Sequence, residues 1–108
     1  MDLEKISDAK LKTVLDRLVP AFAPKKVYLF GSRAIGNAKS ESDYDLLLVV
    51  SSSEKTRHQR MIQAMDLLWD TGISVDVFIY TEAEFDEWKS EPSSIPNTVL
   101  TQGVEISL

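Results

Sequence analysis

The sequence predicts a small α/β domain in which helices flank one mixed β-sheet. Short runs rich in β-branched and aromatic residues alternate with longer segments whose apolar residues recur at helical spacing. A helical segment separates two of these runs and has the length of a crossover between neighbouring strands. The chain of 108 residues, 44% hydrophobic and 27% charged, can form one hydrophobic core. We therefore expect a single domain over residues 1–108.

The composition restricts the classes of partner. The net charge of −5 repels phosphate backbones, so we expect no binding of long nucleic acid, although a small nucleotide carried with Mg²⁺ is compatible with this charge. The absence of cysteine excludes disulfides and thiolate metal sites. No run approaches the roughly 18 apolar residues that span a bilayer, and the first residues lack a signal-peptide pattern. We expect a cytoplasmic protein that contacts no membrane.

The first third of the chain predicts a helix followed by a strand. The helix is expected to begin near Ser7, whose side chain or a neighbour's can cap it, and to end or bend at Pro20. A buried strand is expected at residues 27–30, between Pro24 and Gly31. The apolar stripe of the helix consists of Leu11, Val14, Leu15, Leu18 and Phe22.

The middle of the chain predicts a loop with one short helical turn at residues 31–42 and then a second strand at 43–50. From Leu46 onward both faces of this strand are apolar, which is typical of a central strand covered on both sides. Asp43 and Asp45 are the exceptions. Because side chains repeat every two residues along a strand, these two aspartates are expected on the same face.

A second helix is expected after the serines at 51–53, which form a polar break and a cap, and it is expected to end at Gly72. His58 is expected on a solvent-facing segment with Arg57 and Arg60. The apolar residues at helical spacing predict a stripe that faces the core. This stripe consists of Met61, Ile62, Met65, Leu68 and Trp69.

The last third completes the sheet. Residues 73–80 alternate as a third strand. Thr81 and Glu84 match a capping box that opens a third helix. A final short helix is expected at 95–102, and residues 104–106 can add an edge strand.

Three aspartates, Asp43, Asp45 and Asp76, form a candidate metal site. Asp76 is a charge in the middle of an apolar strand pattern. Nucleotidyl transfer depends on positioning and charge neutralisation, often by two metal ions about 3.5–4 Å apart. Two aspartates on one strand face can share such ions, and the third can complete the site or act as a base. Few carboxylates with phosphate oxygens and water suit Mg²⁺.

Gly31 and Ser32 form the complementary phosphate-binding half. Glycine lets the backbone approach a phosphate closely, and N–H groups at the start of a helical turn attract anions. The Ser32 hydroxyl can donate to a phosphate oxygen, whereas Arg33 can add charge there or face solvent. Each aspartate could instead be a solvated strand end, but the fixed distance from Gly31 and Ser32 favours a functional role.

These motifs resemble a known family. Gly31-Ser32, ten intervening residues and then Asp43-x-Asp45, with a later strand aspartate, are similar to the nucleotidyltransferase superfamily that includes DNA polymerase beta. The short length resembles its minimal nucleotidyltransferase (MNT) branch, although Ile35 stands where arginine is frequent. The resemblance implies a polymerase beta-like fold, a nucleoside triphosphate donor, usually ATP, and Mg²⁺. It also implies transfer of a nucleoside monophosphate to a hydroxyl with release of pyrophosphate.

The same resemblance implies a protein partner. Members of the MNT branch commonly act beside a helical HEPN protein as toxin–antitoxin pairs, in which the MNT protein attaches AMP to a tyrosine of the toxin. Two alternatives remain open from the sequence. The protein could be an antitoxin that neutralises its partner by binding alone, or a subunit of a small-molecule nucleotidyltransferase whose acceptor pocket is completed by dimerisation.

Overall fold

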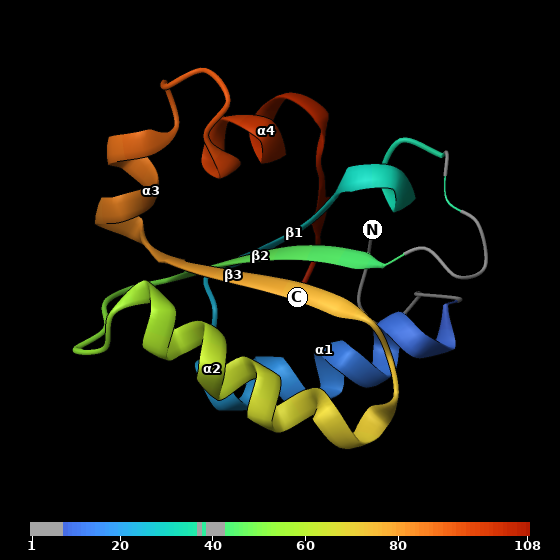
Figure 1. Cartoon of the computed structure of the whole chain (residues 1–108). Coiled ribbons are helices and arrows are strands. Elements are labelled where there is room, and N and C mark those ends of the chain that lie inside the picture. The colour runs from blue at the N-terminus through green and yellow to red at the C-terminus, as the bar shows by residue number, and fades with distance from the viewer. Residues whose placement is uncertain (1–7, 37, 39–42) are drawn as a thin grey trace.

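The computed structural model describes residues 8–36, 38 and 43–108, and in this part of the chain one four-stranded sheet carries two helices on each face (Figure 1). The strand order is β3-β2-β1-β4. The central strand β2 pairs with β1 antiparallel and with β3 parallel, while β4 pairs with β1 antiparallel. The expected mixed sheet is confirmed. The strands span Lys26–Phe30 (β1), Tyr44–Val50 (β2), Val75–Thr81 (β3) and Val104–Ile106 (β4).

Helix α1 spans Ala9–Phe22 and buries most of the expected stripe. Its cap is Asp8, whose carboxylate accepts hydrogen bonds from the N–H groups of Lys10 and Leu11 at 3.0 and 3.1 Å; Ser7 lies outside the described residues. Of the two outcomes expected at Pro20, the end of the helix is wrong, because Pro20 lies inside α1, and the bend stays a prediction. Proline removes its own helical hydrogen bond, but the bond from the Ala23 N–H to the Val19 carbonyl carries the helix through Phe22.

Helix α2 spans Arg57–Leu68 and connects the parallel strands β2 and β3, as a crossover should. The cap expected at residues 51–53 is instead Thr56, which forms a capping box with Gln59. The chain then turns through Trp69–Thr71 to Gly72, which has the positive φ of +69° expected of a residue that ends a helix.

The apolar stripe predicted for α2 is largely wrong. Trp69 is 80% exposed, Met65 58% and Ile62 44%, whereas the buried side chains are Arg60, Ala64 and Leu68. The buried residues repeat every fourth position and therefore lie on one face of the helix. Helix α2 and the turn that follows it have more apolar residues than this face can bury, so three large ones remain on the surface.

Arg60 was expected to face solvent, and this prediction is also wrong, because Arg60 is only 4% exposed. Its guanidinium donates to the Ile79 carbonyl at 2.7 Å and to the Glu84 carboxylate at 2.8 Å. It also donates to the Lys55 carbonyl. Burial of a charge is tolerated when it is paired and hydrogen-bonded in this way. The contact ties α2 to α3 (Glu82–Trp88).

The two faces of the sheet form two cores. The larger core lies between the sheet and the pair α1 and α2, and the smaller lies beneath α3 and α4 (Ile95–Gln102). The capping box that opens α3 and the range of α4 agree with the sequence prediction. No helix among the described residues is long and apolar enough to cross a membrane. The smaller core contains Tyr28, Leu47, Val49, Tyr80, Phe85 and Val99.

Candidate active site

Two of the predicted aspartates lie side by side on neighbouring strands. The parallel pairing of β2 and β3 aligns Asp45 with Asp76, and Phe30 of β1 lies on the other side of Asp45. Asp45 is partly buried and Asp76 is exposed. Asp76 was expected in the middle of its strand but is the second residue of β3, because the strand begins at Val75. The pair therefore lies at the end of the sheet where both strands begin.

This end of the sheet stays open. Asp45 shares its side of β2 with Leu47 and Val49, and α3 and α4 pack over those two residues further along the strand. Figure 1 shows α3 at the opposite end of the sheet from the turn that follows β1. The aspartates are thus on the sheet face of the smaller core, beyond the helices that cover it.

Burial raises the pKa of the Asp45 carboxyl, and the negative charges of Asp76 and Asp43 raise it further. Asp43 is exposed and immediately precedes β2. Its negative charge therefore acts on Asp45 from just outside the strand. Like charges around one carboxylate disfavour ionisation unless a cation relieves them. The electrostatics of this end of the sheet therefore suit a bound cation.

The donor set fits a metal ion that brings other ligands with it. In residues 8–36, 38 and 43–108, no three acidic, histidine or cysteine side chains gather closely enough to hold a metal ion together. Mg²⁺ in nucleotide enzymes is commonly held by one or two carboxylates, with phosphate oxygens and water filling the remaining positions. The adjacent pair of Asp45 and Asp76 is compatible with such a site.

Gly31 connects the phosphate-binding turn to the aspartates. Its φ is +75°, and a Cβ atom placed on it would overlap the Asp45 carboxylate oxygen and lie 3.1 Å from the Asp45 Cγ. The turn that it opens spans Gly31–Arg33, and the N–H groups of Ala34 and Ile35 donate to the Gly31 carbonyl. Glycine is required here by both conformation and space. The next residue, Ser32, therefore lies on a turn that packs against Asp45.

Arg33 packs on Tyr44, whose hydroxyl is hydrogen-bonded to the residue that caps α1. Its guanidinium carbon lies 4.0 Å from the centre of the Tyr44 ring, and the Tyr44 hydroxyl donates to the Asp8 carboxylate at 2.6 Å. Burial and this hydrogen bond raise the pKa of Tyr44 to about 12. Sequence reasoning missed this cluster. One signal was present, because Tyr44 lies between Asp43 and Asp45 and so has to point to the opposite face of the strand, into the larger core.

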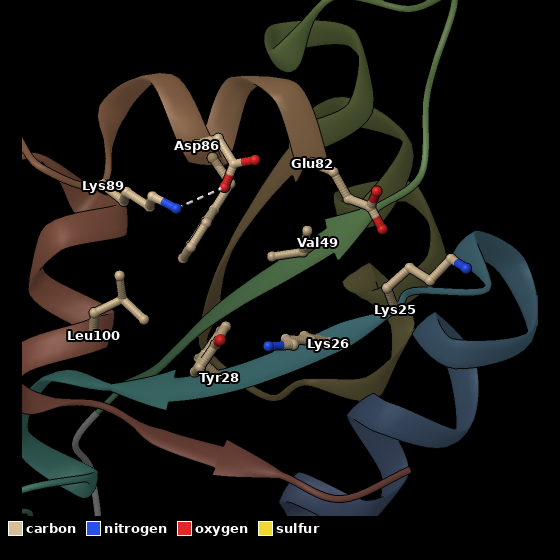
Figure 2. A pocket seen from close by; sticks show the side chains of 9 residues that line it. Lys25, Lys26, Tyr28, Val49, Glu82, Asp86, Lys89 and Leu100 are labelled. Carbon is tan, nitrogen blue, oxygen red and sulfur yellow. Dashed lines mark hydrogen bonds and ion pairs between the residues drawn. The ribbon is translucent and has the colours of Figure 1, made fainter.

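A groove of about 340 Å³ lies elsewhere on the same face, between β1, α3 and α4 (Figure 2). Figure 2 shows lysines along the two sides of this groove, with Lys89 bonded to Asp86 at 3.1 Å. Lys26 is four residues from Phe30 along β1, a separation of about 13 Å. None of the predicted site residues line this groove, so it is separate from the aspartates. Its lining is Lys25, Lys26, Tyr28, Val49, Glu82, Phe85, Asp86, Lys89 and Leu100.

Comparison with known proteins identifies the family. Residues 9–100 match the nucleotidyltransferase domain family, and the chain belongs to it. A solved structure described as a toxin-antitoxin with AMP-PNP contains a similar chain. That chain is 21% identical, with a TM-score of 0.49, and the alignment covers 86% of this chain and 69% of the other. No curated protein sequence matches this chain significantly.

Proposed function

We propose that this nucleotidyltransferase-family protein transfers AMP from ATP to a hydroxyl group of a protein partner, with a divalent cation such as Mg²⁺ held by Asp45 and Asp76. One observation carries the proposal. Asp45 and Asp76 are paired on adjacent strands at an open end of the sheet, so their side chains leave the same face side by side, and the turn that begins with Gly31 packs against Asp45. Membership of the nucleotidyltransferase domain family supports this assignment.

Each residue has a distinct task in this proposal. The bound cation would neutralise charge on the phosphate groups during transfer. Asp45 and Asp76 would hold it, while Asp43, at the entry to β2, would add negative charge that attracts the cation. The close approach of the Gly31 backbone and the Ser32 hydroxyl would position the triphosphate. Arg33 packs on the Tyr44 ring, and the proposal gives it no role in phosphate binding.

The reaction requires one proton acceptor. The oxygen of the acceptor hydroxyl forms a bond to the α-phosphorus of ATP, the bond to pyrophosphate breaks, and the hydroxyl proton leaves. Asp76 is the exposed carboxylate of the pair, so it can accept this proton directly or through water. The products are an AMP ester of the acceptor and pyrophosphate.

The acceptor is proposed from the motif. Gly31-Ser32 followed by Asp43-x-Asp45 resembles the MNT branch, whose members commonly modify a tyrosine of a helical HEPN toxin. We therefore propose a HEPN-like partner, with a tyrosine as the acceptor and the present chain as the antitoxin. Asp76 is exposed, so an acceptor side chain can approach it from solvent.

The direct test is transfer of label from ATP labelled at the α-phosphate, with Mg²⁺ and the purified product of the neighbouring gene as the acceptor protein. We expect label on a tyrosine of that protein, and loss of label with Asp45→Asn and with Asp76→Asn. Asp86→Asn is the matched control, because Asp86 is an exposed acid in the separate groove. Absence of transfer by the natural protein, or equal transfer by Asp45→Asn, would contradict the proposal.

A cellular assay separates catalysis from neutralisation by binding. The double variant Asp43→Asn, Asp45→Asn is expected to bind the partner but to lose protection of cells that express it. Full protection by this variant would instead identify an antitoxin that acts by complex formation alone.

A further inference from the structure

Strand β3 is an edge strand without the usual protection. In the part of the chain that the structure describes, β3 pairs with β2 on one side only. Figure 1 shows it on the side of the sheet towards the viewer, with no element in front of it. Natural edges are commonly protected by short length, proline, lysine or a covering segment. The other edge, β4, has three residues, whereas β3 has seven and a single charge, at Asp76.

An apolar surface adjoins this edge. Two shallow grooves, of about 360 and 220 Å³, follow β3 and share Val77. One contains Met61 and the other Met65 and Trp69, from the part of α2 and its following turn that was expected to be buried. Trp69 is 80% exposed, and large apolar side chains left on a surface beside an open strand are typical of an interaction site.

The two ends of this surface carry opposite charge. Arg57 and His58, in the first turn of α2, line the groove near the end of β3, and the Arg57 guanidinium lies 4.9 Å from the Tyr80 ring centre. At the beginning of β3 lies Asp76, aligned with Asp45. A second copy of the same surface, turned end to end, therefore meets each acidic end with a basic end.

We propose that β3 and the adjoining side of α2 form a self-association surface, on which a second copy adds its own β3 antiparallel across a two-fold axis near Phe78. Two-fold pairing is self-complementary, so each favourable contact occurs twice. In this arrangement Asp76 of each copy faces the Arg57 end of the other, and the backbone groups of both edges become paired. Asp76 is also a proposed metal ligand, so this pairing competes with a cation bound at Asp76, and the dimer is expected of the metal-free protein.

The charge pattern favours a second copy over an unrelated protein. A different partner could use the same apolar grooves and the same open edge. It would not need opposite charges at the two ends of β3, whereas an antiparallel copy does, because it presents Arg57 wherever the first copy presents Asp76. Complementary charge of this kind sets orientation and register in addition to affinity.

The test is the mass of the purified full chain, measured by sedimentation over a dilution series in the micromolar range. We expect a dimer that dissociates on dilution. Trp69→Glu is expected to weaken the dimer by at least about tenfold, since large aromatic side chains buried in an interface carry much of its energy. Arg57→Glu is expected to weaken it as well, because it places like charges at both ends. Trp88→Glu, on α3, is the matched control and should leave the dimer unchanged.

Circular dichroism of each variant checks that it is folded. Increased protection of the β3 amides from hydrogen exchange at higher protein concentration provides a second readout that needs no substitution. A monomer at all concentrations would overturn the proposal. A dimer that survives both Trp69→Glu and Arg57→Glu, or one that is lost only with Trp88→Glu, would place the interface elsewhere and overturn it equally.

Discussion

The two faces of the sheet differ in how completely helices cover them. Towards α1 and α2, β2 contributes Leu46 and Leu48, which are fully buried in the larger core. Towards α3 and α4 the same strand contributes Leu47 and Val49 to the smaller core but leaves Asp45 beyond the helices. Strand β2 therefore stabilises the fold through the face that contacts α1 and α2. On its other face it presents a charged, accessible residue at one end. Substitutions on the two faces should have separable effects.

The largest expected effect on stability follows from a substitution in the larger core, on the sheet face towards α1 and α2. Leu48→Ala should lower the free energy of unfolding by about 3 kcal/mol, since it removes a fully buried side chain and leaves a cavity. Urea denaturation followed by circular dichroism measures this change. Leu100→Ala, at a leucine that is 50% exposed, should change stability by less than about 0.5 kcal/mol. Similar losses for the two variants would show that the covered face is not the main core.

Removal of the ion pair that links α2 to α3 should have the next largest effect on stability. Glu84 of α3 pairs with the buried Arg60 of α2, and this contact lowers the pKa of Glu84 to about 2. Glu84→Gln keeps the capping box but removes the charge, so we expect a loss of about 2 kcal/mol at neutral pH. Glu87→Gln, at an exposed acid of the same helix, should be close to neutral.

The pH dependence sharpens this prediction. The ordinary pKa of Glu84 is 4.5 and the folded value is about 2. A lowered folded pKa means that the stabilising contribution is complete above about pH 4.5 and is lost as the pH falls towards 2. The stability difference between the natural protein and Glu84→Gln should therefore shrink over this range in acid denaturation. A difference that stays constant from pH 5 to pH 2 would contradict the ion pair.

A smaller effect on stability is expected at the open end, with a larger effect on activity. Gly31 and Gly36 both have positive φ, but only Gly31 lies against Asp45, while a Cβ at Gly36 would meet nothing within 4 Å. Both alanine variants should lose about 1 kcal/mol from backbone strain. Gly31→Ala should lose more, and it should also abolish label transfer because the Asp45 carboxylate has to move. Equal transfer by the two variants would show that contact with Asp45 is unimportant.

The comparison of α1 with α2 shows how far the sequence predicts the fold. The stripe of α1 is correct because its apolar residues are about as many as its buried face requires. On α2 the buried face contains Arg60, whose partner Glu84 is 24 residues away in the chain. Local spacing contains no information about that partner. The periodicity therefore predicts the wrong buried face and puts Met65 and Trp69 in the core, whereas both are exposed.

The position of the candidate site was predictable because it depends mostly on local sequence. Gly31, Ser32, Asp43 and Asp45 lie within one short segment, and the crossover helix required that the strand carrying Asp76 lie beside β2. The role of Arg33 was not predictable, since its contact depends on where the Tyr44 ring packs in the larger core. The roles of these residues in catalysis remain predictions.

The most direct test of the site is binding of Mn²⁺, a paramagnetic substitute for Mg²⁺ that shares its preference for oxygen ligands. Titration in the presence of a non-hydrolysable ATP analogue, followed by water proton relaxation, requires no acceptor. We expect saturable binding that Mg²⁺ displaces, that Asp45→Asn and Asp76→Asn weaken at least about tenfold, and that Asp86→Asn leaves unchanged. Equal Mn²⁺ affinity for the natural protein and Asp45→Asn would show that the paired aspartates do not hold the metal.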